Sequence, residues 1–487
     1  MSLRALDQLA IKRLATDSRR VRRGDTFVAY PGATVDGRKF IAQAIANGAR
    51  AVLWERRGFK WTSSLRVPNL GVTDLRARAG LIASHVYGNP SARLWMVGVT
   101  GTNGKTTCSQ WIARAMSDNG RRSAVIGTLG YGLRKALKPL TNTTPDAVWL
   151  HAQLAEFARR GARATSMEVS SIGLDQGRVA GVQFDVALFT NLTRDHFDYH
   201  GTLRRYRAAK ARLFDCESLK YAVINLDDEF GAELATRSRR RGLKVIGYGF
   251  GLRGRGNGKR IARVTGSNLV ADARGVRFDV ATPWGAARVA SRVLGRFNAS
   301  NLLGTLAVLL ASGVSLRKAV AALGKAAPVS GRMQTVGGGA RPLVVVDYAH
   351  TPDALKQVLH ALRELINADS SRLICVFGCG GERDRGKRPQ MGRIATRLAD
   401  QVVITSDNPR RENPRAIMRD IAAGAGAAAE CELDRRRAIK RAIGAARRGD
   451  VVLIAGKGHE KYQEINGVRR PFSDLEVARA ALRRRAA

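Results

Sequence analysis

The sequence predicts an α/β protein of three domains, with a doubly wound central sheet, a small α/β domain before it and another α/β domain after it. The chain has 487 residues, and a single hydrophobic core stops growing near about 250–300 residues. From about residue 94 onward, short apolar runs alternate with amphipathic stretches, which is typical of parallel strands joined by helices. A composition of 45% apolar and 25% charged residues excludes a disordered or collagen-like chain.

The first 90 residues mix short strands with turns. Apolar strands are expected at 26–29 and 51–54, between turn signals such as Pro31-Gly32, and a helix-like run follows over 75–87. This pattern predicts a small N-terminal α/β domain over residues 1–90.

The middle of the chain repeats an alternation of strand and helix. The strand MVGVT at 96–100 leads into a glycine-rich turn and an amphipathic stretch at 106–119. Between about 259 and 294 the pattern changes to strands separated by turns, before a helix-like run over 298–312. Further buried strands are expected at 124–130, 164–169, 186–192, 221–226 and 244–249. We expect one central domain over residues 91–328.

A second α/β series follows a change of pattern near residues 328–332. Helical or turn sequence follows each of its apolar runs, which lie at 343–349, 373–379, 401–407 and 451–457. This series predicts a C-terminal domain over residues 329–487.

The charge of the chain is abnormal, with 83 Lys and Arg against 40 Asp and Glu and a formal net charge of +43. A nucleic-acid-binding protein needs such cations to neutralise phosphates. However, the arginines are spread from Arg4 to Arg485, and no nucleic-acid-binding motif accompanies them. We expect a solvated basic surface that attracts small anionic substrates and has no specific nucleic-acid partner.

The sequence also indicates a compartment. No run of about 18 apolar residues is present, so no transmembrane segment is expected. The N-terminal segment has no apolar stretch before a small-residue cleavage site, so no secretory signal is expected. The five cysteines are too few and too irregularly spaced for a disulfide framework. A reducing cytoplasm is the expected location.

A phosphate-binding loop is predicted at 98–107, GVTGTNGKTT, between a strand and a helix. Its glycines let backbone N–H groups approach phosphate oxygens, and the helix N-terminus favours negative charge. Lys105 can reach the terminal phosphates, and the Thr106 hydroxyl can bind Mg²⁺. The strict Walker spacing would need glycine where this chain has Val99. We expect ATP to bind Gly101, Thr102, Asn103, Gly104, Lys105, Thr106 and Thr107.

Six further motifs follow in order: TNTTP at 141–145, EVSS at 168–171, NLTRDH at 191–196, GRFN at 295–298, DYAH at 347–350 and DNPR at 407–410. With the loop GTNGKTT they resemble the Mur ligases, the ATP-dependent amide-forming enzymes of peptidoglycan synthesis. The loop alone does not choose among the members, which include folylpolyglutamate synthetase. Together, the motifs resemble the member that adds meso-2,6-diaminopimelate to UDP-N-acetylmuramoyl-L-alanyl-D-glutamate. The resemblance implies a P-loop-type central sheet and a Rossmann-like C-terminal domain.

The resemblance also implies a mechanism. ATP, with Mg²⁺, would phosphorylate the substrate carboxylate, and an amine would then displace phosphate from the acyl phosphate. It implies that Lys210 carries a carbamate (N6-carboxylysine), which needs a neutral amine, so burial and neighbouring cations would help. The implied catalytic residues are Lys105, Glu168, His196 and Lys210, and the implied metal-binding residues are Thr106, Glu168, His196 and Lys210.

The ligand sites are implied in the same way. ATP would also contact Asn298, Asp347 and His350. The UDP-N-acetylmuramoyl-dipeptide would bind Thr16, Ser18, Ala33, Thr34, Val35, Asn142, Thr143, Thr144, Ser170, Gln176 and Arg178. The amino acid meso-diaminopimelate would bind Arg383, Asp407, Asn408, Pro409, Arg410, Gly456 and Glu460. Ligands held between domains imply closure about linkers near residues 90 and 330.

Three alternative functions stay open. A lysine-adding version of the same ligase would differ mainly at residues 407–410. Folylpolyglutamate synthetase would leave the N-terminal domain unexplained. A nucleic-acid-binding P-loop NTPase would explain the charge, and it would bind nucleic acid tightly in a salt-sensitive way. We expect a monomer.

Overall fold

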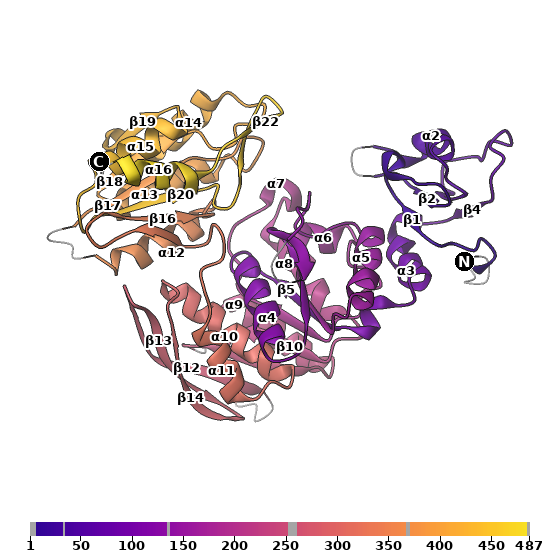
Figure 1. Ribbon diagram of the computed structural model, residues 1–487, viewed down its shortest axis with the longest axis horizontal. Helices are drawn as coiled ribbons and strands as arrows, with labels where there is room; N and C mark the ends of the chain where they lie inside the picture. Colours follow the sequence, from indigo (N-terminus) through magenta and orange to yellow (C-terminus); the bar gives the residue numbers. More distant parts are fainter. Residues whose placement is uncertain (1–5, 33–34, 134–136, 252–260, 367–370, 485–487) are drawn as a thin grey trace.

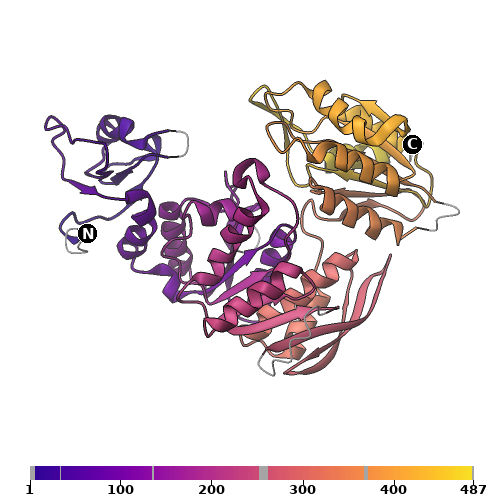
Figure 2. The same cartoon turned by 180° about the vertical axis from the view of Figure 1, so that it is seen from behind.

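The computed structural model describes residues 6–32, 35–133, 137–251, 261–366 and 371–484, with three main sheets in successive regions of the chain. We call these the N-terminal, central and C-terminal regions; their sheets span residues 14–72, 95–291 and 334–455. Figure 1 shows the regions as an arc with the central one in the middle, and Figure 2 shows the same separation from behind. None of the helices in the described ranges combines the length and apolar character needed to span a bilayer.

The N-terminal region is a parallel four-stranded sheet against which the helices α2 and α3 are placed in the described residues. Helix α3 packs against α5 of the central region, and a Cβ atom on Gly80 would lie 2.3 Å from the carbonyl oxygen of Ala180. The glycine therefore lets the two backbones touch. In sheet order the strands are β1 (Leu14–Ala15), β2 (Thr26–Ala29), β3 (Ala51–Glu55) and β4 (Asn69–Val72), and the helices are α2 (Ile41–Ala46) and α3 (Leu75–Val86).

The central region is a ten-stranded sheet in the order β14-β13-β12-β11-β10-β9-β5-β8-β6-β7. The strands from β6 to β12 in this order are parallel, whereas β7, β13 and β14 pair antiparallel with their neighbours. The strands are β5 (Trp95–Thr100), β6 (Ser123–Gly127), β7 (Gly130–Leu133), β8 (Ala164–Glu168), β9 (Val186–Phe189), β10 (Tyr221–Asn225), β11 (Lys244–Gly249), β12 (Ala262–Asp272), β13 (Gly275–Thr282) and β14 (Gly285–Ser291).

The helices of this region cover the sheet and carry much of the core. The helix α10 is buried along nearly its whole length because it is apolar on all sides and packs on both α4 and the strands β10 to β13. The helices are α4 (Lys105–Asp118), α5 (Ala147–Arg159), α6 (Ser171–Asp175), α7 (Phe197–His200), α8 (Leu203–Ala211), α9 (Glu229–Arg240), α10 (Arg296–Ala311) and α11 (Leu316–Gly324).

The prediction of one strand over residues 124–130 is wrong. The single strand expected over 124–130 is two strands, β6 and β7, which pair as a tight hairpin. The chain turns between them because the backbone N–H of Thr128 donates to Glu168 Oε1 at 2.7 Å and Gly130 takes a φ of 117°. A buried carboxylate far along the chain therefore ends β6, and no local pattern carries that information.

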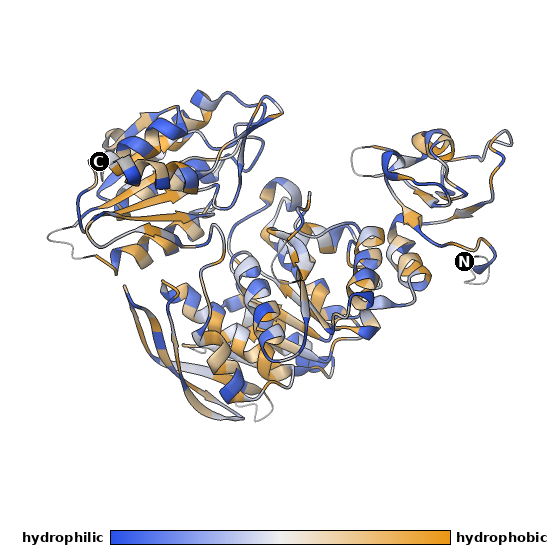
Figure 3. Cartoon of the chain, viewed as in Figure 1, coloured by the Kyte–Doolittle hydropathy of each residue, from blue (hydrophilic) through white to orange (hydrophobic). Residues whose placement is uncertain are grey.

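The C-terminal region is a six-stranded sheet with apolar clusters on both faces. Figure 3 shows its strands as predominantly hydrophobic, with polar residues on the covering helices. The strands in sheet order are β15 (Gln334–Gly337), β16 (Leu343–Asp347), β20 (Val451–Ala455), β17 (Leu373–Phe377), β18 (Gln401–Thr405) and β19 (Ala429–Glu432). The helices are α12 (Pro352–Arg363), α13 (Lys387–Leu398), α14 (Pro414–Ala425), α15 (Arg435–Ala445) and α16 (Asp474–Arg484).

A two-stranded ribbon, β21 (Tyr462–Ile465) and β22 (Val468–Pro471), projects from the C-terminal region. The neighbouring strands β16, β20, β17 and β18 are parallel, so their carboxyl ends meet at one edge of the sheet. Ligands of open α/β sheets bind at such an edge, where the strand order reverses. The segments that follow these strands carry the motifs DYAH, DNPR and GKGHE.

Candidate active site

The predicted phosphate loop joins β5 to α4, and its conformation requires glycine at two positions. Gly101 and Gly104 have φ angles of 146° and 87°. A Cβ atom on Gly101 would lie 1.9 Å from Thr190 Oγ1, and one on Gly104 would lie 2.4 Å from Asn301 Oδ1. The loop is therefore pressed against the end of β9 and against α10. Helix α4 begins at Lys105, so its N-terminus can hold an anion there.

Two lysine side chains meet at the carbonyl oxygen of Gly101. Lys105 Nζ donates to this oxygen at 2.8 Å and to the carbonyl oxygen of Thr102 at 2.7 Å, and Lys210 Nζ donates to the Gly101 oxygen at 2.7 Å. Lys210 lies on α8 and is only 1% exposed. Burial, and then the neighbouring charge of Lys105, lower the pKa of Lys210 well below its ordinary value. The surroundings of Lys210 therefore favour the neutral amine.

A cluster of oxygen atoms lies beside the loop. Glu168, at the end of β8, is 1% exposed. Its Oε2 accepts hydrogen bonds from Thr106 Oγ1 at 2.9 Å and from Thr128 Oγ1 at 3.0 Å. The hydroxyl of Thr143 lies 3.1 Å from that of Thr128. Mg²⁺ prefers oxygen ligands, such as carboxylate and hydroxyl oxygens, so Thr106 and Glu168 are suited to hold this ion.

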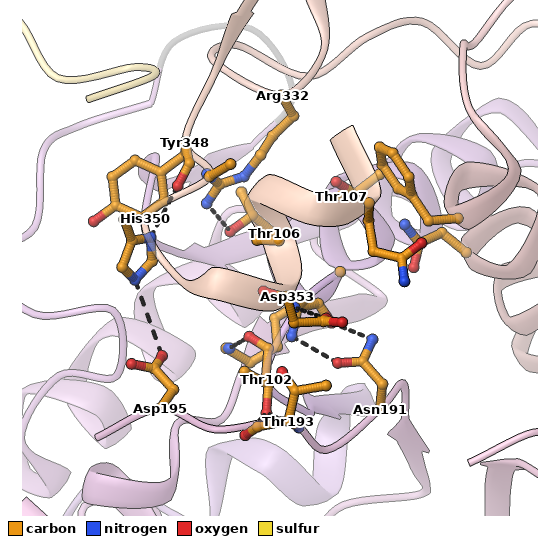
Figure 4. A pocket seen from close by; sticks show the side chains of 18 of the residues that line it. Thr102, Thr106, Thr107, Asn191, Thr193, Asp195, Arg332, Tyr348, His350 and Asp353 are labelled. Atoms are coloured by element: carbon orange, nitrogen blue, oxygen red, sulfur yellow. Dashed lines mark hydrogen bonds and ion pairs between the residues drawn. The ribbon is translucent and has the colours of Figure 1, made fainter. Parts of the chain in front are cut away.

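Asp195 lies between two histidines. Its Oδ2 is 3.4 Å from His196 Nε2 and 3.9 Å from His350 Nε2, and Figure 4 shows His350 pointing toward it. Burial alone would raise the pKa of Asp195, but His196, His350, Lys387 and Lys105 together lower it below its usual range. Burial lowers the pKa of His350 to about 4. Among the described residues expected to bind the metal ion, His196 forms an ion pair with Asp195, whereas Thr106 and Glu168 form a hydrogen bond with each other.

A cavity of about 460 Å³ lies between the central and C-terminal regions, with the phosphate loop in its wall. The cavity brings together nearly all residues expected to bind ATP and the metal ion. Asp347 lines it, but its two carboxylate oxygens accept hydrogen bonds from the backbone N–H groups of Met333 at 2.7 Å and Ala349 at 2.8 Å. The lining includes residues 102–107, Glu168, His196, Lys210 and Asn298 from the central region, and Arg332, Asp347 and His350 from the C-terminal region.

Arg332 is a site residue that the sequence motifs did not include. Its Nη2 donates to Thr106 Oγ1 at 3.3 Å, and its guanidinium lies 4.3 Å from the centre of the Tyr348 ring. Figure 4 marks the hydrogen bond to Thr106 as a dashed line. The preceding Gly331 has a φ of 66°, and a Cβ there would lie 2.1 Å from the backbone nitrogen of His459. Because the chain is rich in arginine, the residue type of Arg332 does not mark it as a site residue. The one signal in the sequence is the glycine directly before it, Gly331.

The central residues expected to bind the dipeptide lie close together. Thr144 Oγ1 lies 3.1 Å from Ser170 Oγ, and Arg178 donates to the carbonyl oxygen of Thr144 at 2.8 Å and to Gln176 Oε1 at 2.6 Å. Two of the expected residues, Thr143 and Ser170, also line the cavity, whereas Asn142 is exposed.

The expected dipeptide-binding residues of the N-terminal region lie apart from this cavity. Ser18 is buried and donates to Gln43 Oε1 at 2.7 Å, Thr16 is half-buried, and Val35 is exposed. Ala33 and Thr34 lie outside the described residues. The structure therefore places the two dipeptide groups in different regions of the chain.

The residues expected to bind the amino acid gather at the carboxyl ends of β18 and β20. Asn408 donates to Glu460 Oε2 at 2.8 Å. Gly456 has a φ of 113°, and a Cβ there would lie 2.4 Å from Asp407 Oδ2, so only glycine fits beside that carboxylate. Pro409 is buried. These residues do not line the 460 Å³ cavity.

The ribbon β21–β22 holds Arg410 in place. The backbone N–H of Arg410 donates to the carbonyl oxygen of Glu464 at 3.1 Å, and its carbonyl oxygen accepts from the N–H of Asn466 at 2.6 Å. Its side chain donates from Nη1 to the carbonyl oxygen of Gly381 at 2.5 Å. Arg383, expected in the same site, instead lies 3.6 Å from Asp198 Oδ2 of the central region.

Three family models match successive parts of the chain. "Mur ligase family, catalytic domain" matches residues 10–87, "Mur ligase middle domain" matches residues 99–309, and "Mur ligase, glutamate ligase domain" matches residues 331–458. The chain belongs to the Mur ligase family. Mur ligases are ATP-dependent ligases, so the expected fold class, family and enzyme class are confirmed.

This Mur ligase has relatives that match it over nearly their whole length. A protein of Chromobacterium violaceum named UDP-N-acetylmuramoyl-L-alanyl-D-glutamate–2,6-diaminopimelate ligase is 53% identical over 97% of this chain and 94% of its own. One of the same name from Nitrosomonas europaea is 51% identical over 98% and 94%. A solved structure with that name superposes with a TM-score of 0.69 at 40% identity, and covers 98% of this chain and 96% of its own.

Proposed function

We propose that this Mur ligase joins meso-2,6-diaminopimelate to UDP-N-acetylmuramoyl-L-alanyl-D-glutamate in cytoplasmic peptidoglycan precursor synthesis. The names of its full-length relatives support this substrate pair. The observation that carries the proposal is the set of polar groups at the carboxyl ends of β18 and β20. Arg410 offers a guanidinium to a carboxylate, and Glu460, bonded to Asn408, offers a carboxylate to an ammonium.

In the proposed reaction the phosphate loop and Lys105 hold the phosphates of ATP. The dipeptide carboxylate attacks the γ-phosphorus, ADP leaves, and an acyl phosphate forms. The amine nitrogen then forms the C–N bond, the bond to phosphate breaks, and a proton leaves the nitrogen. Arg332, which contacts Thr106, is placed to stabilise negative charge on the transferring phosphoryl group.

The proposal includes Mg²⁺ held by Thr106 and Glu168, whose oxygens fit this ion. When bound, Mg²⁺ neutralises charge on the phosphates. A carbamate on Lys210 would add anionic oxygens, and His196 would serve a further metal position. The burial of Lys210 supports the carbamate, because CO₂ reacts with the neutral amine.

The test is selectivity between meso-diaminopimelate and L-lysine, which lacks the second carboxylate. Arg410→Ala is expected to lower kcat/KM for meso-diaminopimelate by about 30-fold or more, since removing one partner of a desolvated charge pair costs about 2–5 kcal/mol. The exposed neighbour Arg411 supplies the control, Arg411→Ala. Wild-type preference for lysine, or full efficiency of Arg410→Ala, would contradict the proposal.

A further inference from the structure

Lys457, in the loop after β20, is a lysine with no exposed surface and no role in the proposed reaction. Its ammonium donates to Asn408 Oδ1 at 2.8 Å and to Glu460 Oε2 at 2.9 Å. A buried ammonium is retained only with such partners, because losing its hydration is expensive. Both of its partners belong to the expected amino-acid site.

The contacts of Lys457 set the orientation of both partners. Asn408 Oδ1 accepts a second hydrogen bond, from the backbone N–H of Glu464 at 2.9 Å. Because two donors face this oxygen, the amide nitrogen must turn to Glu460, to whose Oε2 it donates at 2.8 Å. In the described part of the chain both side-chain hydrogen bonds to Glu460 fall on Oε2. Its Oε1 is thereby left to accept from a ligand.

We propose that Lys457 is a positioning residue that sets the choice of amino acid, an inference that rests on the proposed function. It directs Glu460 toward the ammonium of the incoming amino acid and balances the charge of that carboxylate. Without Lys457, Glu460 would lose its ion-pair partner while keeping its negative charge. Such a site would repel the additional carboxylate of meso-diaminopimelate and favour L-lysine, which carries one more net positive charge.

The first experiment is steady-state kinetics of the full-length Lys457→Met enzyme. We expect KM for meso-diaminopimelate to rise about 30-fold or more, as for other buried charge pairs that lose one partner. KM for ATP and for the UDP-dipeptide should stay within about twofold, and the efficiency ratio of meso-diaminopimelate to L-lysine should fall about tenfold or more. The same substitution at the exposed Lys461, Lys461→Met, is the matched control and should change none of these values.

A second experiment separates positioning from folding. The double variant Lys457→Met/Glu460→Gln removes both charges of the pair, so it leaves no unpaired buried ion even where Lys457→Met alone fails to fold. If Lys457 acts through Glu460, KM of the double variant equals that of Glu460→Gln within about threefold, because coupled residues are non-additive. A multiplicative loss would overturn the proposal, as would a loss confined to kcat.

The two proposals fail differently. A wild-type enzyme that ligates L-lysine rather than meso-diaminopimelate would overturn the proposed function. A wild-type enzyme selective for meso-diaminopimelate whose KM is unchanged in Lys457→Met would overturn only the role of Lys457.

Discussion

At the scale of single residues, the site is built around one carbonyl oxygen. Lys105 and Lys210 both donate to the oxygen of Gly101, although Lys210 lies 109 residues away in the chain. Burial, and then repulsion from the ammonium group of Lys105, lower the pKa of Lys210. The surroundings of Lys210 therefore favour its uncharged form.

We predict that Lys210→Ala abolishes most of the ligase activity and that formate or acetate partly restores it. These small carboxylates can supply the anionic oxygens of the missing carbamate. The measurement is turnover with and without added carboxylate. Lys318→Ala, at an exposed lysine on α11, should behave as wild type with no response to formate. A fully active Lys210→Ala enzyme would remove the carbamate from the mechanism.

At this scale, the motifs point to residues that lie within them and give no signal for residues outside them. The phosphate loop and Glu168 meet as expected, since Thr106 contacts the carboxylate directly. Arg332 was missed because one arginine among many carries no local pattern. Lys457 was missed as well, although it lies between the expected Gly456 and Glu460. The sequence of a basic segment does not show which of its lysines is buried.

At the scale of elements, a fully buried ion pair joins two helices to two strand ends. Arg435, the first residue of α15, donates through Nε and Nη2 to both carboxylate oxygens of Asp474, the first residue of α16, at 2.8 Å each. It also donates to the carbonyl oxygens of Ala455 at 2.9 Å and Ser406 at 3.4 Å. Ala455 is the last residue of β20 and directly precedes Gly456. Ser406 follows β18 and directly precedes Asp407.

We predict that Arg435→Ala destabilises the C-terminal region by about 3–5 kcal/mol, because it leaves the Asp474 carboxylate buried and unpaired. Urea unfolding followed by fluorescence measures the loss. The exposed neighbour on the same helix gives the control, Arg437→Ala, with an expected change within about 0.5 kcal/mol. An Arg435→Ala protein as stable as the control would mean that the pair contributes nothing to the fold.

At the scale of the whole molecule, the central and C-terminal regions are joined by reciprocal ion pairs. Arg194 lies 3.2 Å from Asp384, and Arg383 lies 3.6 Å from Asp198. All four side chains are partly exposed, and exposed pairs contribute only about 0–1 kcal/mol each. These two pairs therefore add little to the contact between the regions seen in Figure 1, and ligands that contact both regions can shift their arrangement.

We predict that the radius of gyration falls when ATP, Mg²⁺, dipeptide substrate and amino acid are all bound, because the ligands draw the regions together. Small-angle X-ray scattering of the full chain, with and without a non-hydrolysable ATP analogue and both substrates, measures the change. Equal radii in the two states would contradict closure.

The net charge of +43 is also a property of the whole molecule. We predict weak nucleic-acid binding at low salt that disappears by about 150 mM salt, since scattered arginines neutralise few adjacent phosphates. Fluorescence anisotropy with labelled DNA and RNA at both salt concentrations tests this. Sequence-selective binding at the higher salt would contradict the interpretation of the charge as a solvated basic surface.

By itself, the sequence determined the alternation of helices and strands, the phosphate loop and the family, because periodicity, glycine-rich turns and contiguous motifs are local properties. Only the tertiary structure decided which distant groups meet. Thr106 and Arg332 are 226 residues apart, and Asn408 and Lys457 are 49 apart. Parallel strands bring Asn408 and Lys457 together by ending at a common edge, whereas Thr106 and Arg332 meet where the central and C-terminal regions face each other across the cavity. The order of residues along the chain specifies neither contact.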